Sequence, residues 1–272
     1  MFNIEAYLDS LPYDIKEIDV SNRGINVLDV SKFKNLKKLN CCCNKLTYLK
    51  LNEKLEELYC YENQLTSLQL NENLKTLFCH TNQLTSLQTA NLKILYCSSN
   101  QLTSLHLNDN LQELHCHTNQ LTSLHLNDNL QELYCNNNQL TSLNLNDNLD
   151  TLYCDNNHLT SLHLNKNLKE LECHNNQLTS LQLNENLRTI LYINNPIYEI
   201  INSDDKDIIN QKLRVLNQFR YLYYSLKFKK QLRDWLWVKI REPKIREKYH
   251  HMYLLENLHD EDADLDEVLD AW

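Results

Sequence analysis

The chain has 272 residues, with ten cysteines, a single glycine and a formal net charge of −9. The negative charge argues against general nucleic-acid binding by the whole molecule, and the lone Gly24 excludes motifs that need several glycines, such as G-x-S-x-G. No apolar run has the length of a membrane span, and the N-terminus lacks the basic start and apolar stretch of a signal peptide. We therefore expect an intracellular, cytoplasmic protein whose thiols stay reduced.

Residues 1–14 precede a long repeat, and we expect them to form an N-terminal cap. The first repeat begins at Ile15 and has Val20 and Arg23 at the positions where later repeats have Cys and Asn. Terminal repeats of a solenoid commonly differ from the internal ones.

Residues 15–200 repeat a pattern of about 19 residues, a period that indicates a solenoid. One unit reads LEELYCYENQLTSLQLNEN, and its apolar positions include Leu55, Leu58, Cys60 and Leu65. About ten units follow one another in register, with first positions at Ile15, Leu36, Leu55, Leu74, Leu92, Leu111, Leu130, Leu149, Leu168 and Leu187.

Each unit is expected to contain a short strand and a return segment. Leu58 and Cys60 flank Tyr59, and this alternation of inward and outward side chains predicts a strand with one buried face. Copies of the strand would stack into a parallel sheet. A unit of this length has no room for a full helix on its return half, so we expect an extended or turn-like segment there, with Leu65, Leu68 and Leu70 in the core.

Two residue types recur at fixed positions and are predicted to be structural. A buried free cysteine acts as a small hydrophobe, and a buried asparagine amide needs hydrogen-bond partners. The cysteines are Cys41, Cys60, Cys79, Cys97, Cys116, Cys135, Cys154 and Cys173. The asparagines are Asn44, Asn63, Asn82, Asn100, Asn119, Asn138, Asn157, Asn176 and Asn195. Because glycine is nearly absent, we also expect asparagine at turns that need positive φ.

The skeleton L-x-x-L-x-C-x-x-N-x-L, which covers about residues 11–200, resembles that of leucine-rich-repeat proteins. The resemblance implies an α/β solenoid with short parallel strands on a concave face and a turn-like convex side. It also implies an asparagine ladder, in which the repeated asparagines bond the backbone of adjacent turns. The ending WLWVKIREPKIREKYHHMYLLENL, joined to these repeats, also resembles uncharacterised leucine-rich-repeat proteins of giant amoeba-infecting DNA viruses. That second resemblance implies a location in the host cytoplasm.

Residues 201–272 depart from the repeat and are predicted to form an α-helical C-terminal cap or tail. Ser203 with Asp204 and Asp205 is a plausible helix start, and apolar residues then recur at helical spacing from Ile209. Residues 206–248 are rich in Lys and Arg, whereas residues 249–272 contain Asp and Glu but no Lys or Arg. A tail that folds back on itself explains this division, and so does a site for a partner.

We expect the concave face of the sheet to bind a partner, because its outward side chains include many aromatic rings flanked by glutamates. The alternative is that the stacked rings only stabilise neighbouring strands. The predicted partner-binding residues are Tyr59, Tyr61, Phe78, His80, Tyr96, His115, His117, Tyr134, Tyr153, Glu172 and His174.

The sequence thus favours a non-catalytic interaction module for a protein partner, which the viral resemblance implies to be a host protein, with no cofactor and no small-molecule substrate. An alternative is an adaptor whose C-terminal region binds an acidic protein, nucleic acid or an anionic membrane.

His115 and His117, with Glu113 and His80 nearby, could hold zinc. Near-identical repeats scatter histidines over exposed positions without any function, however, and we predict no metal site. Cys42 is expected to be exposed.

Overall fold

The computed structural model describes residues 2–89, 91–203 and 205–218. Contacts divide the chain into two compact units, residues 1–214 and 215–272, and the fold below is that of the first unit. The predicted basic stretch from residue 219 onward and the acidic tail lie outside the described residues.

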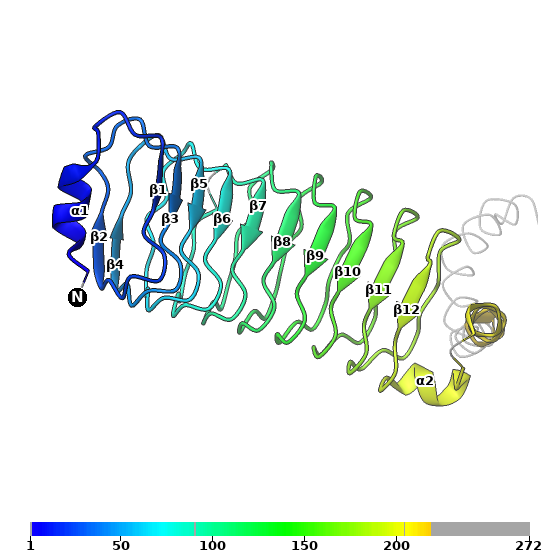
Figure 1. Cartoon of the computed structure of the whole chain (residues 1–272). Helices are drawn as coiled ribbons and strands as arrows, with labels where there is room; N and C mark the ends of the chain where they lie inside the picture. Colours follow the sequence, from blue (N-terminus) through cyan, green and yellow to red (C-terminus); the bar gives the residue numbers. More distant parts are fainter. Residues whose placement is uncertain (1, 90, 204, 219–272) are drawn as a thin grey trace, which may run out of the picture. The chain divides into compact units, whose positions relative to one another are not determined.

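A ten-stranded parallel sheet runs through the repeat region (Figure 1), in the order β1-β3-β5-β6-β7-β8-β9-β10-β11-β12. Its strands are β1 (Glu17–Asp19), β3 (Lys38–Asn40), β5 (Glu57–Tyr59), β6 (Thr76–Phe78), β7 (Ile94–Tyr96), β8 (Glu113–His115), β9 (Glu132–Tyr134), β10 (Thr151–Tyr153), β11 (Glu170–Glu172) and β12 (Thr189–Leu191). Each strand pairs with the equivalent residues of the next repeat, as Leu133 does with Leu152. The predicted parallel-strand solenoid is confirmed.

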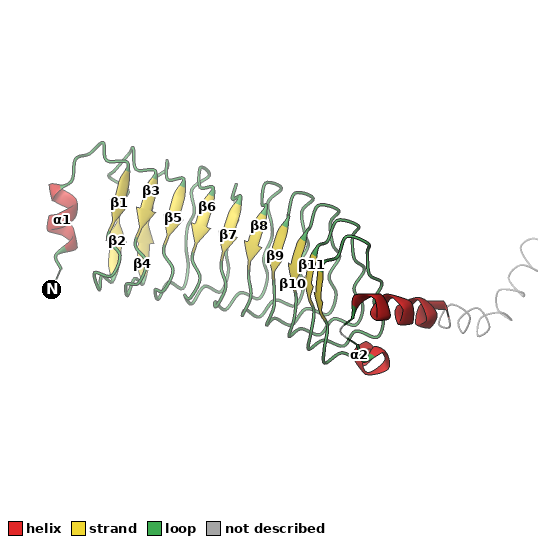
Figure 2. Cartoon of the chain, turned by 45° about the vertical axis from the view of Figure 1, so that its right-hand side comes forward, coloured by secondary structure: helices red, strands yellow, loops and turns green. Residues whose placement is uncertain are grey.

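The return segments are mostly loops without regular structure (Figure 2), as the unit length predicts. An exception lies near the N-terminus, where β2 (Val27–Asp29) and β4 (Tyr48–Lys50) form a second, two-stranded sheet. The core prediction for the return segment is only partly right. Leu65 is fully buried, whereas Leu68 and Leu70 are half-buried and reach the rim of the core.

The repeated cysteines line the core as free thiols, as predicted. Cys116 and Cys135 are fully buried, and burial raises the pKa of both thiols well above its ordinary value. The expectation for Cys42 was wrong. Only 4% of this residue is exposed, and its small side chain interacts with that of Tyr61 in the next repeat.

The repeated asparagines join each turn of the solenoid to the turn before it, as Asn138 shows. Its Nδ2 donates to Cys135 O within its own turn and to Cys116 O of the previous turn, both at 3.1 Å. Its Oδ1 accepts from Leu121 N of the previous turn at 2.9 Å. The same set of bonds recurs at Asn119 and Asn157. The predicted asparagine ladder is therefore confirmed at the level of individual bonds.

Two further asparagine ladders, not predicted, lie on the return side. In the first, Asn165 Nδ2 donates to Leu149 O at 2.9 Å and to Asn146 O at 2.5 Å. In the second, Asn167 Nδ2 donates to Asp147 O at 2.7 Å. The repeated L-N-x-N after each return segment is the sequence signal that accompanies them. All three ladders use side-chain amides to satisfy carbonyls that a loop leaves without a regular partner.

The residue before each ladder asparagine, and before Arg23 at the same position of the first repeat, has a left-handed backbone, with φ between 52° and 56°. The residues in this position are Asn22, Cys43, Glu62, Thr81, Ser99, Thr118, Asn137, Asn156, Asn175 and Asn194. The expectation of asparagine at such turns thus holds for half of the units. In the others a Cys, Glu, Ser or Thr adopts a conformation that costs side chains with a Cβ about 1–2 kcal/mol.

Helices flank the solenoid in the first unit. At the N-terminus, α1 (Ile4–Ser10) lies within the predicted cap, and the Asn3 side chain accepts from Ala6 N at its start. At the other end, α2 (Pro196–Ile201) follows the last repeat, and residues 206–218 are helical. That helix begins as predicted from the acidic cluster, since Asp205 Oδ1 accepts from Asp207 N and Ile208 N. Within the described residues no helix is long and apolar enough to cross a membrane.

The left-handed turns predict opposite changes in stability for two opposite substitutions. Thr81 and Asn137 are both exposed at equivalent turns, and asparagine tolerates positive φ better than a β-branched residue. Thr81→Asn should raise the free energy of unfolding by about 1 kcal/mol, and Asn137→Thr should lower it by about as much, in urea denaturation. Thr85→Asn, at an exposed position outside these turns, serves as the control and should change little. Equal effects of the two Thr→Asn substitutions would contradict the backbone explanation.

Candidate binding face of the sheet

Six of the predicted residues form one continuous stack of rings on the outer face of the ten-stranded sheet. The parallel register places equivalent residues side by side in adjacent strands. Ring centroids along Tyr59, Phe78, Tyr96, His115, Tyr134 and Tyr153 are separated by 5.0, 4.3, 3.8, 4.1 and 4.8 Å, with interplanar angles of at most 21°. We call these six residues the aromatic column. Because each ring covers the face of its neighbour, the column presents ring edges and hydroxyl groups to solvent.

The second predicted column, two residues further along each strand, is not a continuous stack. Tyr61 stacks on His80 with 4.5 Å between centroids, but the next position is the buried Ser98. His117 and His174, the other predicted members, are half-buried. The alternation in the sequence therefore predicted that both columns lie on the outer face of the sheet. It did not show that only the first column is a continuous stack of rings.

Glutamates border the aromatic column on its strand-start side. Glu113 accepts a hydrogen bond from Tyr96 Oη, and its Oε1 lies 3.1 Å from His115 Nε2. Among the described residues, Glu113, Glu132 and Glu170 form no ion pair with Lys or Arg. Burial, and then repulsion from Glu113 and nearby carboxylates, raises the pKa of Glu132. This part of the face thus carries negative charge that no neighbouring lysine or arginine neutralises.

The face differs at the N-terminal end of the column. There Lys38 pairs with Glu57 at 3.3 Å, and its Nζ lies 5.4 Å from the centroid of Tyr59. At the strand-start position, the glutamate of β5 thus has a lysine partner, whereas among the described residues those of β8, β9 and β11 have no Lys or Arg partner.

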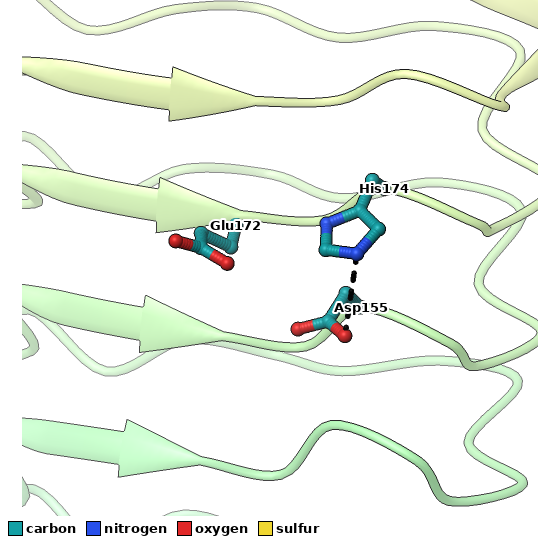
Figure 3. A group of neighbouring side chains, drawn as sticks. All are labelled: Asp155, Glu172 and His174. Atoms are coloured by element: carbon teal, nitrogen blue, oxygen red, sulfur yellow. Dashed lines mark ion pairs between the residues drawn. The ribbon is translucent and has the colours of Figure 1, made fainter.

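Asp155, Glu172 and His174 lie together beyond the end of the aromatic column (Figure 3). One potential ligand atom from each lies within 4.8 Å of the others, and His174 Nε2 is 3.5 Å from Asp155 Oδ2. The histidines that stand out in the sequence, His115 and His117 with Glu113 and His80, form a different group. Within the described residues, they do not bring three potential ligand atoms this close together.

Solved structures with a similar fold connect this geometry to known proteins. The functional domain of InlJ from Listeria monocytogenes, described as including a cysteine ladder, is 32% identical with a TM-score of 0.65; the match covers 73% of this chain and 47% of that one. YopM from Yersinia enterocolitica WA-314 is 25% identical with a TM-score of 0.53, over 66% and 49%. A further match, at 18% identity and a TM-score of 0.50 over 68% and 77%, is to the octameric complex of Latrophilin 3, Unc5D and the leucine-rich repeats of FLRT2.

The chain has the leucine-rich-repeat fold. It spans about half the length of InlJ and YopM. No family model matches it, and no curated protein sequence matches it.

Three histidines on the sheet face of this leucine-rich-repeat solenoid are held in their neutral form. Burial is the leading cause that lowers the pKa of His80, His115 and His117, and Glu113 partly opposes this at His115. In the unfolded chain the same imidazoles take up protons as the pH falls through about 6.5. The unfolded state therefore binds more protons below that pH, and the folded state loses stability.

These shifts predict a pH dependence of unfolding. The free energy of unfolding should be lower at pH about 5.5 than at pH about 7.5, and the triple variant His80→Gln, His115→Gln, His117→Gln should lose much of this difference. The control is His106→Gln, His125→Gln, His163→Gln, which changes three exposed histidines of the return side and should keep it. Urea denaturation at both pH values measures the effect. The same slope in both triple variants would contradict the assignment.

Proposed function

We propose that this chain is a non-catalytic interaction module that binds a cationic segment of a partner protein on the outer face of its sheet. The observation that carries the proposal is the aromatic column bordered by glutamates without Lys or Arg partners, from β8 to β11. The face that the sequence predicts to be concave is the same face.

The aromatic column supports the proposal because its rings are fixed before any partner arrives. Tyr134 lies between His115 and Tyr153, and it cannot change rotamer without breaking two stacking contacts. A side chain that is ordered in advance loses little conformational entropy on binding, which is one reason why tyrosine is enriched at interface hot spots. The alternative, that stacking only stabilises the strands, predicts that ring edges make no contact with a partner.

Charge supports a cationic partner over a neutral or acidic one. The side chain of Glu132 has no hydrogen bond or ion pair within the described residues, and after burial, repulsion from the neighbouring carboxylates contributes to its raised pKa. A lysine or arginine placed between Glu132 and Glu170 would relieve that repulsion, and it would also speed association by electrostatic attraction.

The related structures are consistent with an interaction role. FLRT2 was solved in a complex with two other proteins, which is a statement about that protein. The expectation that the partner is a host protein stays a prediction. The alternative adaptor function, in which the C-terminal region carries the interaction, concerns residues that lie mostly outside the described part of the chain.

The charge prediction is tested with a short Lys/Arg-rich peptide and fluorescence anisotropy. The variant Glu132→Gln, Glu170→Gln removes two charges from the sheet face and should weaken binding by about 10-fold. Its matched control is Asp128→Asn, Asp147→Asn, which removes two charges from exposed loops of the return side and should weaken binding by no more than about 2-fold. Equal weakening in both variants would show that only net charge matters.

The contribution of the rings is tested in the same assay. Tyr134→Ala should weaken peptide binding, whereas Tyr48→Ala, at a tyrosine of the return side that is 52% exposed, should leave binding unchanged. Circular dichroism must show that both variants are folded. Unchanged binding by a folded Tyr134→Ala variant would mean that stacking only supports the strands.

A further inference from the structure

Two acidic side chains depart from the repeat pattern beside a histidine at one place on the sheet face. Glu172 occupies the position that six aromatic rings occupy in the preceding strands, and Asp155 is a buried carboxylate in the second column. His174 is the next residue of that column, one strand further on. Figure 3 shows the three side chains on the same face, Asp155 on one repeat and the other two on the next.

Asp155 is buried without full compensation for its charge. Its side chain is 8% exposed, and its Oδ2 accepts from Asn156 Nδ2 at 2.6 Å and faces His174 Nε2. Its other oxygen, Oδ1, accepts no hydrogen bond from the described residues, and Figure 3 shows it on the side of Glu172. This oxygen is not among the buried polar atoms without a partner, so a cation or a donor from outside the chain can reach it; the buried polar atom of the group without a partner is His174 Nδ1.

The side chain of Glu172 lies beside this carboxylate and forms no hydrogen bond or ion pair within the described residues. Two carboxylates thus lie close together, and the imidazole of His174 pairs with the carboxylate of Asp155.

We propose that Asp155, Glu172 and His174 bind one divalent transition-metal ion, with Zn²⁺ as the ion that fits best. One imidazole nitrogen with two carboxylate oxygens is a ligand set that zinc accepts in tetrahedral sites, at bonds of about 2.0–2.2 Å, with a fourth position left for water. Such bonds bring ligand atoms to about 3.4 Å from one another. The potential ligand atoms now lie within 4.8 Å of one another. Small rotations of the three side chains, with the backbone unchanged, would shorten these distances to about 3.4 Å. Calcium fits less well because it prefers six to eight oxygen ligands.

This site adjoins the proposed peptide-binding face, because Glu172 lies in register beside Tyr153, the last ring of the aromatic column. Metal binding and peptide binding are nevertheless measured with different probes, so one can fail without the other. The other histidines of the same column, such as His80, lack a pair of carboxylates beside them and provide internal controls.

Isothermal titration of the full chain with Zn²⁺, after removal of any purification tag, tests the proposal. Asp155→Asn and Glu172→Gln keep the size of each side chain and should each weaken one Zn²⁺ site by at least about 100-fold. The controls His80→Gln and Asp147→Asn should bind as the unchanged chain does. Histidines and acidic residues elsewhere could add weaker Zn²⁺ sites. The quantity to compare is therefore the number of tight Zn²⁺ sites per chain in each variant and in the unchanged chain.

Cobalt(II) used as the probe separates this site from the cysteines. Ligation by imidazole and carboxylates gives d–d bands in the visible without the thiolate charge-transfer band in the near ultraviolet. The expected result is d–d absorption that disappears in Glu172→Gln, with circular dichroism unchanged. Equal Zn²⁺ binding by Glu172→Gln and the unchanged chain, no binding at all, or a thiolate band that persists in both variants would each overturn the proposal.

Discussion

The side-chain amide of each ladder asparagine joins two consecutive turns of the solenoid, and the rest of the structure depends on this bond set. Asn138 occupies a position where the chain leaves the sheet, so the backbone groups around it have no regular strand partner. It provides donors to two carbonyls and an acceptor to one amide, and one carbonyl and the amide belong to the previous turn. The left-handed residue just before it turns the chain so that the amide points inward. Every turn is thereby held at the same height and rotation relative to the last.

A fixed register has a direct consequence for the outer face of the sheet. Equivalent positions in adjacent strands lie side by side, so a residue type repeated in the sequence becomes a column in space. The aromatic column is the result at one position, and an uncompensated row of glutamates is the result at another. Where the repeat changes, as at Asp155 and Glu172, the change creates a new local group of side chains. Function in such a fold is therefore expected at the residues that differ from the repeat or that repeat on the outer face.

Much of this architecture could be predicted from the sequence because the pattern was repeated. The inward positions of Leu58 and Cys60 followed from alternation, and the amide ladder followed from the resemblance to leucine-rich repeats. The partly exposed Leu70 and the buried Cys42 could not be predicted in this way, because their exposure depends on which neighbouring side chains cover them. The left-handed conformation of Thr81 gave no local signal, since threonine disfavours it and the surrounding bonds impose it. The grouping of Asp155 with His174 depends on side-chain rotamers between strands, which spacing does not determine.

Urea denaturation of Asn138→Ala tests the central claim most directly. The substitution leaves Cys116 O, Cys135 O and Leu121 N without their partner, and each such buried group costs about 1–3 kcal/mol. We predict a loss of about 3 kcal/mol or more in the free energy of unfolding. Asn136→Ala, at a side chain on the outer face without a hydrogen bond in the described structure, should lose no more than about 0.5 kcal/mol. A loss as small in Asn138→Ala as in Asn136→Ala would contradict the claim that the amide ladder holds consecutive turns together.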